Sequence, residues 1–301
     1  MSTSDGLLTY SKEQLEPSSR LLLSFVISYF ISLLFALTFQ VEFQLKHIVV
    51  PSLSTFLLLV YYRVSDEFKD FETDKKFFPD RPIPSGKITL KELGMVLIIV
   101  SALSIILNLF FPYAIGEFLA AFIFTFCMGK WFFMESIISK NRLIAFLTHA
   151  PVGIFMYGYT EKYLLATYQQ HMDVAPLLSL ICFILFPGLT WEVLRKTYLP
   201  KDEMPGYQIY STMLGFRGAL FFGLFWVVLT VVNNYLMIGY FPVLKAMGLP
   251  LLIINLVLSS LILKHAYKPF TDNLKKITEA YMGVHLILPI LYLSWIYYVQ
   301  R

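Results

Sequence analysis

The sequence has little charge and almost no cysteine. Only 15% of its 301 residues are Asp, Glu, Lys or Arg, where a soluble domain has about 25%, while 57% are hydrophobic. The two cysteines, Cys127 and Cys182, both lie in apolar runs. We interpret them as buried apolar side chains rather than as a disulfide or a metal pair. This composition excludes an ordinary water-soluble domain and predicts an integral membrane protein.

The sequence also lacks the features of a cleavable signal peptide. Residues 1–19 are polar, and the first apolar run, residues 20–40, is too long for the hydrophobic core of a signal and has no small-residue cleavage site. We interpret this run as the first membrane span. Alternation of apolar and polar residues, which strands of a membrane barrel require, is missing from the apolar runs as well.

Nine apolar runs are long enough to cross the hydrocarbon core as helices, which takes about 20 residues. Lipid offers the backbone no hydrogen-bond partner, so these spans are expected to be helical. The predicted fold class is therefore all-α, a polytopic membrane protein with nine transmembrane helices. We expect residues 1–19 to form an N-terminal arm and residues 20–301 a single nine-helix domain. The predicted spans are residues 20–40, 46–64, 90–111, 114–135, 142–165, 174–194, 214–237, 241–263 and 277–299.

The cationic residues predict the orientation, because Lys and Arg accumulate on the cytoplasmic side of a membrane protein. With the N-terminus in the cytoplasm, only Lys46, Lys162, Lys245 and Arg301 of the 24 Lys and Arg residues fall on the outer side. Two acid-rich segments, after the second and the sixth span, then face the cytoplasm. They stand four spans apart, which hints at an internal repeat.

The densest cluster of charges is SDEFKDFETDKKFFPDRPIPSG, residues 65–86. Asp66, Asp70 and Asp74 recur at every fourth position, so they share one face if the helix of the second span continues. Three neighbouring carboxylates repel one another and favour a bound cation. Their hard oxygen atoms suit Mg²⁺, which shares its coordination shell with substrate phosphates. The alternative is a solvated loop that its own lysines neutralise.

The pattern D-E-x-x-D-x-x-x-D followed by R-P-x-P-S-G resembles the first signature of the UbiA superfamily of intramembrane prenyltransferases. The usual form of that signature is N-D-x-x-D-x-x-x-D. Asp66 stands where Asn is common and Glu67 where Asp is common, while Asp70 and Asp74 match. The position after the second span and the number of spans agree with the family as well. The resemblance implies that Asp66, Asp70 and Asp74 hold Mg²⁺.

The segment TWEVLRKTYLPKDEMPGYQIYSTMLG, residues 190–215, stands where the resemblance places a second signature, D-x-x-x-D-x-x-x-D. Glu192 takes its first acidic position, Lys196 stands where the next acid is expected, and Asp202 is the candidate for the last. The resemblance implies Glu192 and Asp202 as ligands of a second Mg²⁺. Arg195 and Lys196 are predicted to contact diphosphate directly. Alternatively, they anchor the sixth span at the cytoplasmic face.

Further candidates are weaker. FCMGK, residues 126–130, is similar to a Y-x-x-x-K element of the family with Phe for Tyr, which implies a diphosphate contact for Lys130; a lysine snorkelling at a helix end is the alternative. Arg81 is another candidate for contact with diphosphate. His149 is a candidate base on the acceptor side, against the alternative of a neutral, hydrogen-bonded histidine. The acids expected near span ends or in short loops, without a catalytic role, are Glu117, Glu135 and Glu161.

The resemblance implies a Mg²⁺-dependent prenyltransferase that ionises an isoprenyl diphosphate and passes the prenyl group to an acceptor. The expected catalytic residues are Asp66, Asp70, Asp74 and Glu192. Diphosphate leaves only if its growing charge is neutralised, which a metal and cationic side chains achieve. The expected partners are the isoprenyl diphosphate, a lipophilic acceptor and the lipid bilayer, with no nucleic acid. We expect an active site that faces the cytoplasm from a bacterial inner membrane.

Two other functions stay open. A membrane terpene cyclase would ionise the same substrate without an acceptor, and the altered second signature keeps this alternative alive. A divalent-cation transporter would use the acidic loop to collect metal. Transporters place charged groups near the middle of the bilayer, whereas the carboxylates here gather at one face, so the sequence favours an enzyme.

Overall fold

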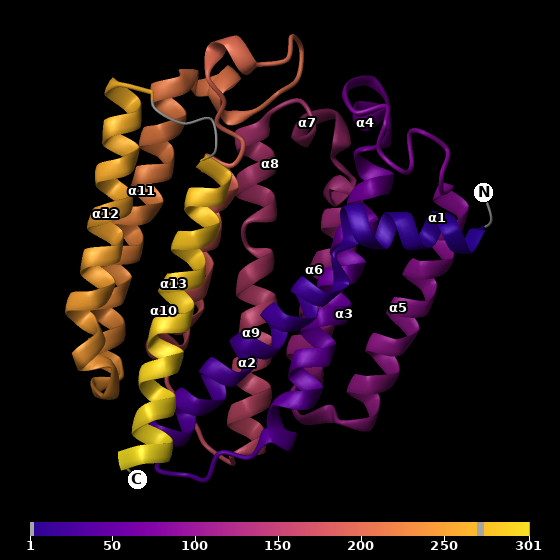
Figure 1. Cartoon of the computed structure of the whole chain (residues 1–301). Coiled ribbons are helices and arrows are strands. Elements are labelled where there is room, and N and C mark those ends of the chain that lie inside the picture. The colour runs from indigo at the N-terminus through magenta and orange to yellow at the C-terminus, as the bar shows by residue number, and fades with distance from the viewer. Residues whose placement is uncertain (1–2, 270–273, 301) are drawn as a thin grey trace. The chain divides into compact units, whose positions relative to one another are not determined.

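The computed structural model describes residues 3–269 and 274–300, and within these ranges it is helical without a strand (Figure 1). The described residues contain nine helical segments that are long and apolar enough to cross a membrane, which confirms the predicted fold class. Arg301, one of the four cations predicted on the outer side, lies outside the described residues. The segments are Pro17–Phe39, Leu45–Lys69, Leu90–Phe110, Pro112–Gly129, Arg142–Thr167, Val174–Leu194, Tyr210–Tyr240, Pro242–Tyr267 and Leu274–Gln300.

Several boundaries differ from the prediction. Residues 3–15 of the N-terminal arm are helical, and the fifth span is broken into two helices at Pro151, whose ring cannot continue a helix. The α-helices are α1 (Thr3–Tyr10), α2 (Pro17–Phe39), α3 (Leu45–Lys69), α4 (Phe71–Phe77), α5 (Leu90–Phe110), α6 (Ile115–Gly129), α7 (Glu135–Ile138), α8 (Arg142–His149), α9 (Val152–Thr167), α10 (Val174–Leu194), α11 (Tyr210–Tyr240), α12 (Gly248–Tyr267) and α13 (Leu274–Trp295).

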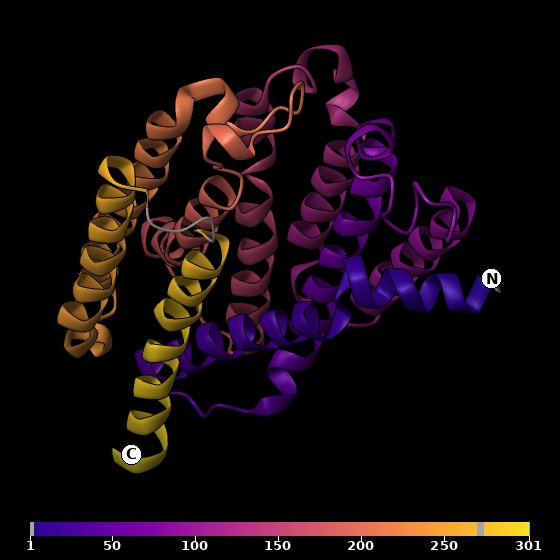
Figure 2. The same ribbon diagram turned by 45° about the horizontal axis from the view of Figure 1, so that its top comes forward.

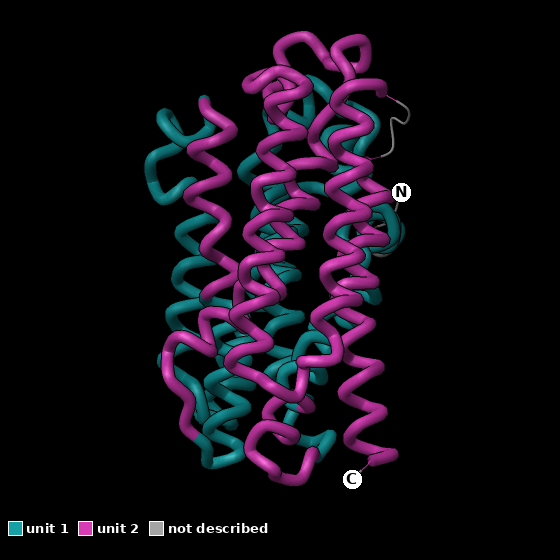
Figure 3. Tube along the Cα trace, turned by 90° about the vertical axis from the view of Figure 1, so that its left-hand side faces the viewer, with its two compact units in different colours: residues 1–32, 44–140, 155–170 teal, residues 33–43, 141–154, 171–301 magenta. Residues whose placement is uncertain are grey.

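The chain forms two compact units, which Figure 3 colours separately. Unit 1 comprises residues 1–32, 44–140 and 155–170, and unit 2 comprises residues 33–43, 141–154 and 171–301. Each unit is described by itself. The prediction of one domain over residues 20–301 stays a prediction.

Unit 1 has an apolar core at the end that carries the acidic segment. Tyr10 of α1, Val64 of α3 and Leu93 of α5 are buried together with Ile83 and Ile88 of the intervening loop. Helix α5 begins at Leu90 because a capping box closes its first turn: the Thr89 hydroxyl accepts from the Glu92 amide, and the Glu92 carboxylate accepts from the Thr89 amide. This capping box fixes the end of the loop that enters α5.

Unit 2 is built around the pair α10 and α11, with α12 running beside α11 in both ribbon views (Figures 1 and 2). The two helices approach closely at Gly223, which packs on the buried Leu194. A hydrophobic core that includes the aromatic residues Phe146 and Tyr210 together with Val193 joins α8, α10 and the start of α11.

A hydrogen bond between a serine and an asparagine joins two helices in each unit, with donor and acceptor exchanged between the two units. In unit 1, the Asn108 amide of α5 donates to the Ser54 hydroxyl of α3 over 2.8 Å. In unit 2, the Ser179 hydroxyl of α10 donates to Asn233 of α11 over 3.1 Å. Each pair is separated by 54 residues along the chain, and such side chains hold membrane helices together. The internal repeat that the spacing of the acidic segments hints at is therefore visible in α3–α5 and α10–α11.

The close approach of α10 and α11 generates a prediction. A Cβ added at Gly223 would stand 2.5 Å from Cδ2 of Leu194, so Gly223→Ala should lower the free energy of unfolding by about 1–3 kcal/mol. Gly239→Ala, on the same helix with nothing within 4 Å, is the control and should be neutral or slightly stabilising. Thermal unfolding in detergent measures both; equal stability of the two variants would contradict the packing.

Candidate functional site

The three aspartates of the first signature follow one another on consecutive helical turns of unit 1. Helix α3 continues to Lys69, as predicted, and α4 resumes at Phe71. The Asp70 amide donates to the Asp66 carbonyl and the Asp74 amide to the Asp70 carbonyl, each over 2.8 Å. Asp70 itself stands between the two helices with φ −98° and ψ 4°, outside the helical range, so the helix is interrupted at the middle aspartate and the three aspartates do not lie on one continuous helix.

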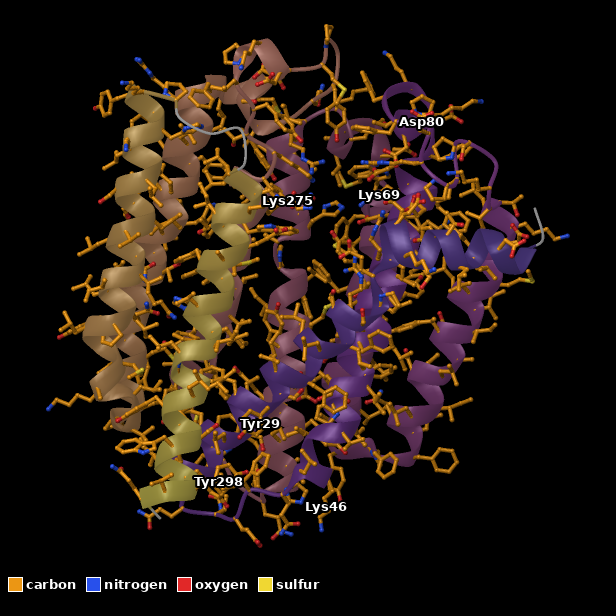
Figure 4. All side chains as sticks on the ribbon, viewed as in Figure 1. Tyr29, Lys46, Lys69, Asp80, Lys275 and Tyr298 are labelled. Carbon is orange, nitrogen blue, oxygen red and sulfur yellow. The ribbon has the colours of Figure 1, made fainter. Side chains whose placement is uncertain are left out.

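Ion pairs neutralise much of this acidic segment. Asp66 pairs with Lys69 at 2.5 Å, and Asp74 pairs with Arg81 at 2.7 Å. Arg81 comes from the RPIPSG loop, and its guanidinium lies 3.9 Å from the centre of the Phe78 ring. The structure therefore brings one predicted cation, Arg81, directly to one predicted metal ligand, Asp74. Figure 4 places Lys69 and Asp80 at one end of unit 1 and Lys46 at the other.

The N-terminal arm covers the next part of this segment. Arg63 pairs with Glu67 at 2.5 Å and donates to the Gln14 side chain over 2.6 Å. Helix α1 approaches the loop by its backbone, because a Cβ added at Gly6 would stand 2.2 Å from the Lys87 carbonyl oxygen. Burial, with a further contribution from Glu67, raises the pKa of the Tyr10 phenol above its usual range. The arm therefore packs against the acidic segment and its loop, a contact that the sequence did not predict.

Lys130 lies beside the same helix of unit 1. It ends α6, and the preceding Gly129 packs on Ser65 of α3, where a Cβ would meet the serine at 3.0 Å. Trp131, Phe132 and Phe133 follow with φ angles of 52°, 52° and 59°, a left-handed conformation that is uncommon for residues other than glycine. The Lys69 ammonium stands 4.7 Å from the centre of the Trp131 ring. The residues on either side of Lys130 therefore contact α3, and the predicted contact of Lys130 with diphosphate stays a prediction.

The second cluster belongs to unit 2 and has the opposite balance of charge. Glu192, in the last turn of α10, accepts from the Arg195 guanidinium on one oxygen, over 2.8 Å to Nε. Its other oxygen accepts from Lys196 over 2.8 Å and from Arg142 over 3.1 Å. One carboxylate is therefore surrounded by three cations, two of which the sequence predicted as diphosphate contacts.

Aromatic rings contact two of these cations. The Arg195 guanidinium lies 4.4 Å from the centre of the Trp191 ring, and that of Arg142 lies 5.7 Å from the centre of the buried Tyr210 ring. Asn141 caps α8 by accepting from the Leu143 amide, which fixes Arg142 in the first turn. The cluster is thus mounted on this hydrophobic core of unit 2.

Asp202 lies elsewhere in unit 2. It is exposed at the end of a short 3₁₀ turn, Pro200–Asp202, and lines a cavity of about 370 Å³ with Thr197, Tyr198 and the buried His265. No described interaction joins it to Glu192.

The structure bears differently on the remaining candidates. His149 ends α8 with its Nδ1 3.0 Å from the Thr148 hydroxyl, and its predicted role stays a prediction. Glu117 and Glu135 are exposed in first turns of helices, as expected. Glu161 lies near the end of its span, as expected, but it is 1% exposed, so the expectation that its charge costs little there is wrong.

The two clusters differ in how they fit a divalent metal. Within residues 3–269 and 274–300, no three His, Cys, Asp or Glu side chains gather closely enough to hold a metal ion. Mg²⁺ needs only one or two carboxylates, because waters and substrate phosphates complete its shell. The aspartates of unit 1, with hard oxygens on successive turns, fit this requirement. Glu192 fits it less well, because three cations surround its two oxygens, whereas Asp66 and Asp74 are each paired with one cation.

Comparison with known proteins identifies the family. The family model described as the UbiA prenyltransferase family matches residues 25–287. The chain belongs to the UbiA prenyltransferase family. A curated relative, the digeranylgeranylglyceryl phosphate synthase of Methanococcus aeolicus, is 30% identical over 112 residues. That alignment covers 37% of this chain and 39% of the relative, so it spans about two fifths of either protein.

Solved structures share the UbiA fold with this chain. A structure of a digeranylgeranylglyceryl phosphate synthase in membranes matches with a TM-score of 0.60 and 20% identity, over 96% of this chain and 98% of its own. An apo UbiA homologue from Aeropyrum pernix K1 gives 0.59 and 14% identity, covering 88% and 97%. A Cd²⁺-bound homologue from Archaeoglobus fulgidus gives 0.56 and 16% identity, covering 95% and 98%.

Sequence reasoning missed Arg142 and Arg63. Each stands in a stretch that the positive-inside asymmetry explains, and Arg142 is 50 residues from its partner Glu192 along the chain. No local spacing links such a pair. Glu67 was aligned with the family's signature but was not chosen as a site residue, although it is 4% exposed and paired.

The pair of Arg63 and Glu67 generates a prediction. Arg63→Gln should lower the free energy of unfolding by on the order of 3 kcal/mol, because it leaves the buried Glu67 without its cation. The double variant with Glu67→Gln should recover part of that loss. Thermal unfolding measures both, with Lys75→Gln at an exposed position as the control. A double variant less stable than Arg63→Gln would contradict the pairing.

Proposed function

We propose that this UbiA family member is a Mg²⁺-dependent membrane prenyltransferase, which ionises an isoprenyl diphosphate and transfers the prenyl group to a lipophilic acceptor. The observation that carries the proposal is the match to the family over residues 25–287. The aspartates on consecutive turns of unit 1 support it. The positive-inside asymmetry supports an active site that faces the cytoplasm from the cell membrane.

Asp66, Asp70 and Asp74 are the proposed metal ligands. Bound there, Mg²⁺ would supply positive charge to the diphosphate as its bond to the allylic carbon breaks. Lys130 and Arg81 of the same unit would bind diphosphate oxygens. For Asp66 and Asp74 to take a metal, Lys69 and Arg81 must leave them, and the arriving diphosphate offers both cations a new partner.

In unit 2, Arg195 and Lys196 are proposed to bind the diphosphate directly. Their charges are held at the carboxyl end of α10, where the helix dipole stabilises cations. The prediction that Glu192 and Asp202 hold a second metal stays a prediction, and the cations around Glu192 favour binding of an anion at this place.

The relative's name guides the choice of substrates. It is named for digeranylgeranylglyceryl phosphate, so geranylgeranyl diphosphate and a geranylgeranylglyceryl phosphate acceptor are the first pair to test. The experiment uses the purified full chain with prenyl diphosphates of ten to twenty carbons, with and without the acceptor, and mass spectrometry of the products. Transfer that requires the acceptor supports the proposal. A cyclic hydrocarbon or terpene alcohol formed without it would establish the cyclase instead.

A variant tests the metal ligands. Asp70→Ala should abolish Mg²⁺-dependent turnover, a loss of at least a hundredfold, because it removes the central carboxylate of the three. The control is Asp80→Ala, which removes an exposed carboxylate of the same segment and should keep normal turnover. Product formation and released diphosphate are measured over a range of Mg²⁺ concentrations. Normal turnover by Asp70→Ala would contradict the proposed metal site.

A further inference from the structure

The second signature of this chain carries the wrong charge for a metal site. Glu192 is the one carboxylate in a cluster with Arg142, Arg195 and Lys196, so the formal charge of the cluster is positive. A divalent cation placed there would be repelled by three neighbouring cations. A polyanion would be attracted.

Comparison of the two repeats identifies a position at which the charge of the side chain differs. Counted from Ser54 and Ser179, which make the equivalent hydrogen bonds in the two units, Glu67 and Glu192 occupy the same position. In the same register, Asp70 of the first repeat is replaced by Arg195 of the second. The second repeat thus has a guanidinium where the first has its central proposed metal ligand.

The cations keep the capacity to bind another anion. Arg195 uses Nε and Nη2 on Glu192, and Lys196 uses one hydrogen bond, whereas a guanidinium carries five N–H donors and an ammonium three. Their side chains are 29% and 18% exposed, so a ligand can reach them while the interaction is partly shielded from water. The Trp191 ring behind Arg195 limits its rotation.

We propose that Arg142, Arg195 and Lys196 form a metal-independent binding site for phosphate oxygens, and that Glu192 is a positioning residue that holds the three cations together. That the bound anion is the substrate's diphosphate rests on the proposed function. The single metal of the enzyme is then the one held by the aspartates of unit 1. Arg142, on a separate helix, is a member of this site that the second signature does not contain.

The test measures the binding of inorganic diphosphate to the purified full chain by isothermal titration calorimetry in EDTA. Diphosphate should bind without metal, and Arg142→Gln should weaken binding about tenfold or more, since hydrogen bonds to charged groups are lost. Lys196→Gln is the second variant, in case Arg142→Gln does not fold. Lys201→Gln removes the same charge from an exposed position of unit 2 outside this cluster and should stay within twofold of the wild type. No binding in EDTA, or equal loss in the Lys201 variant, would overturn the proposal.

Glu192 is tested by counting bound Mn²⁺ through its electron paramagnetic resonance. Glu192→Leu should weaken diphosphate binding about tenfold because the cations lose their shared acceptor, and Glu192→Gln, whose amide oxygen still accepts, should recover part of it. Both variants should bind as much Mn²⁺ as the wild type, whereas Asp70→Ala should bind less. Loss of one Mn²⁺ per chain in the Glu192 variants would overturn the positioning role and establish a second metal.

Two further outcomes separate the proposals. Prenyl transfer by a protein that does not bind diphosphate in EDTA would overturn this inference and leave the proposed function intact. Diphosphate binding by a protein that transfers no prenyl group would support the anion site and contradict the function. A lipid headgroup presents the same phosphate chemistry, so the titration is repeated in nanodiscs with and without phosphatidylglycerol. Binding of that lipid, lost in Arg142→Gln, without binding of diphosphate would overturn the assignment to the substrate.

Discussion

Pairing of charges at helix ends is the interaction on which the rest of the candidate site depends. A charge beside the apolar part of a membrane protein is costly unless a partner neutralises it. The chain meets this constraint locally: Arg63 holds Glu67, Lys69 holds Asp66, and Arg81 reaches back from its loop to Asp74. These pairs keep a dense acidic segment folded before any ligand arrives. They also fix its surroundings, because Arg63 ties down the N-terminal arm and Arg81 the RPIPSG loop.

Much of the fold and part of the site could be predicted from the sequence. Nine spans follow from hydropathy because lipid leaves a bare backbone no alternative to helix. The spacing of the three aspartates also predicts the continuation of α3 beyond its apolar part, but not the break between α3 and α4 at Asp70. The docking of α1 could not be predicted, because it depends on the contact of Gly6 with the carbonyl of Lys87, 81 residues further along the chain. Arg142 and Glu161 were missed for a related reason: partner and burial are set by helices distant in sequence.

The two units contain similar pairs of hydrogen-bonded helices, but the charged side chains at the ends of these helices differ in sign. A serine and an asparagine join α3 to α5, and an equivalent pair joins α10 to α11. In each unit a glutamate follows at the same position near the end of the first helix of the pair. Glu67 has one cation and neighbouring aspartates, while the partners of Glu192 among the described residues are three cations. A shared backbone with different charged side chains therefore produces a candidate cation site in one unit and a candidate anion site in the other.

This difference has a consequence for how a diphosphate would be held. Positive charge from a metal is present only when the metal is bound, and it depends on metal concentration and on competition with Lys69 and Arg81 for the aspartates. Positive charge from Arg195 is permanent, because a guanidinium does not lose its proton in a protein, and its planar fork suits phosphate oxygens. Binding of the anion and its neutralisation during bond cleavage are then separate tasks. Under the proposed function, the fixed side chains would perform the first at all metal concentrations, and the aspartates would hold the ion that supplies further positive charge. A chain that has replaced an acid of its second signature by a base can therefore lose one metal and still hold the leaving group.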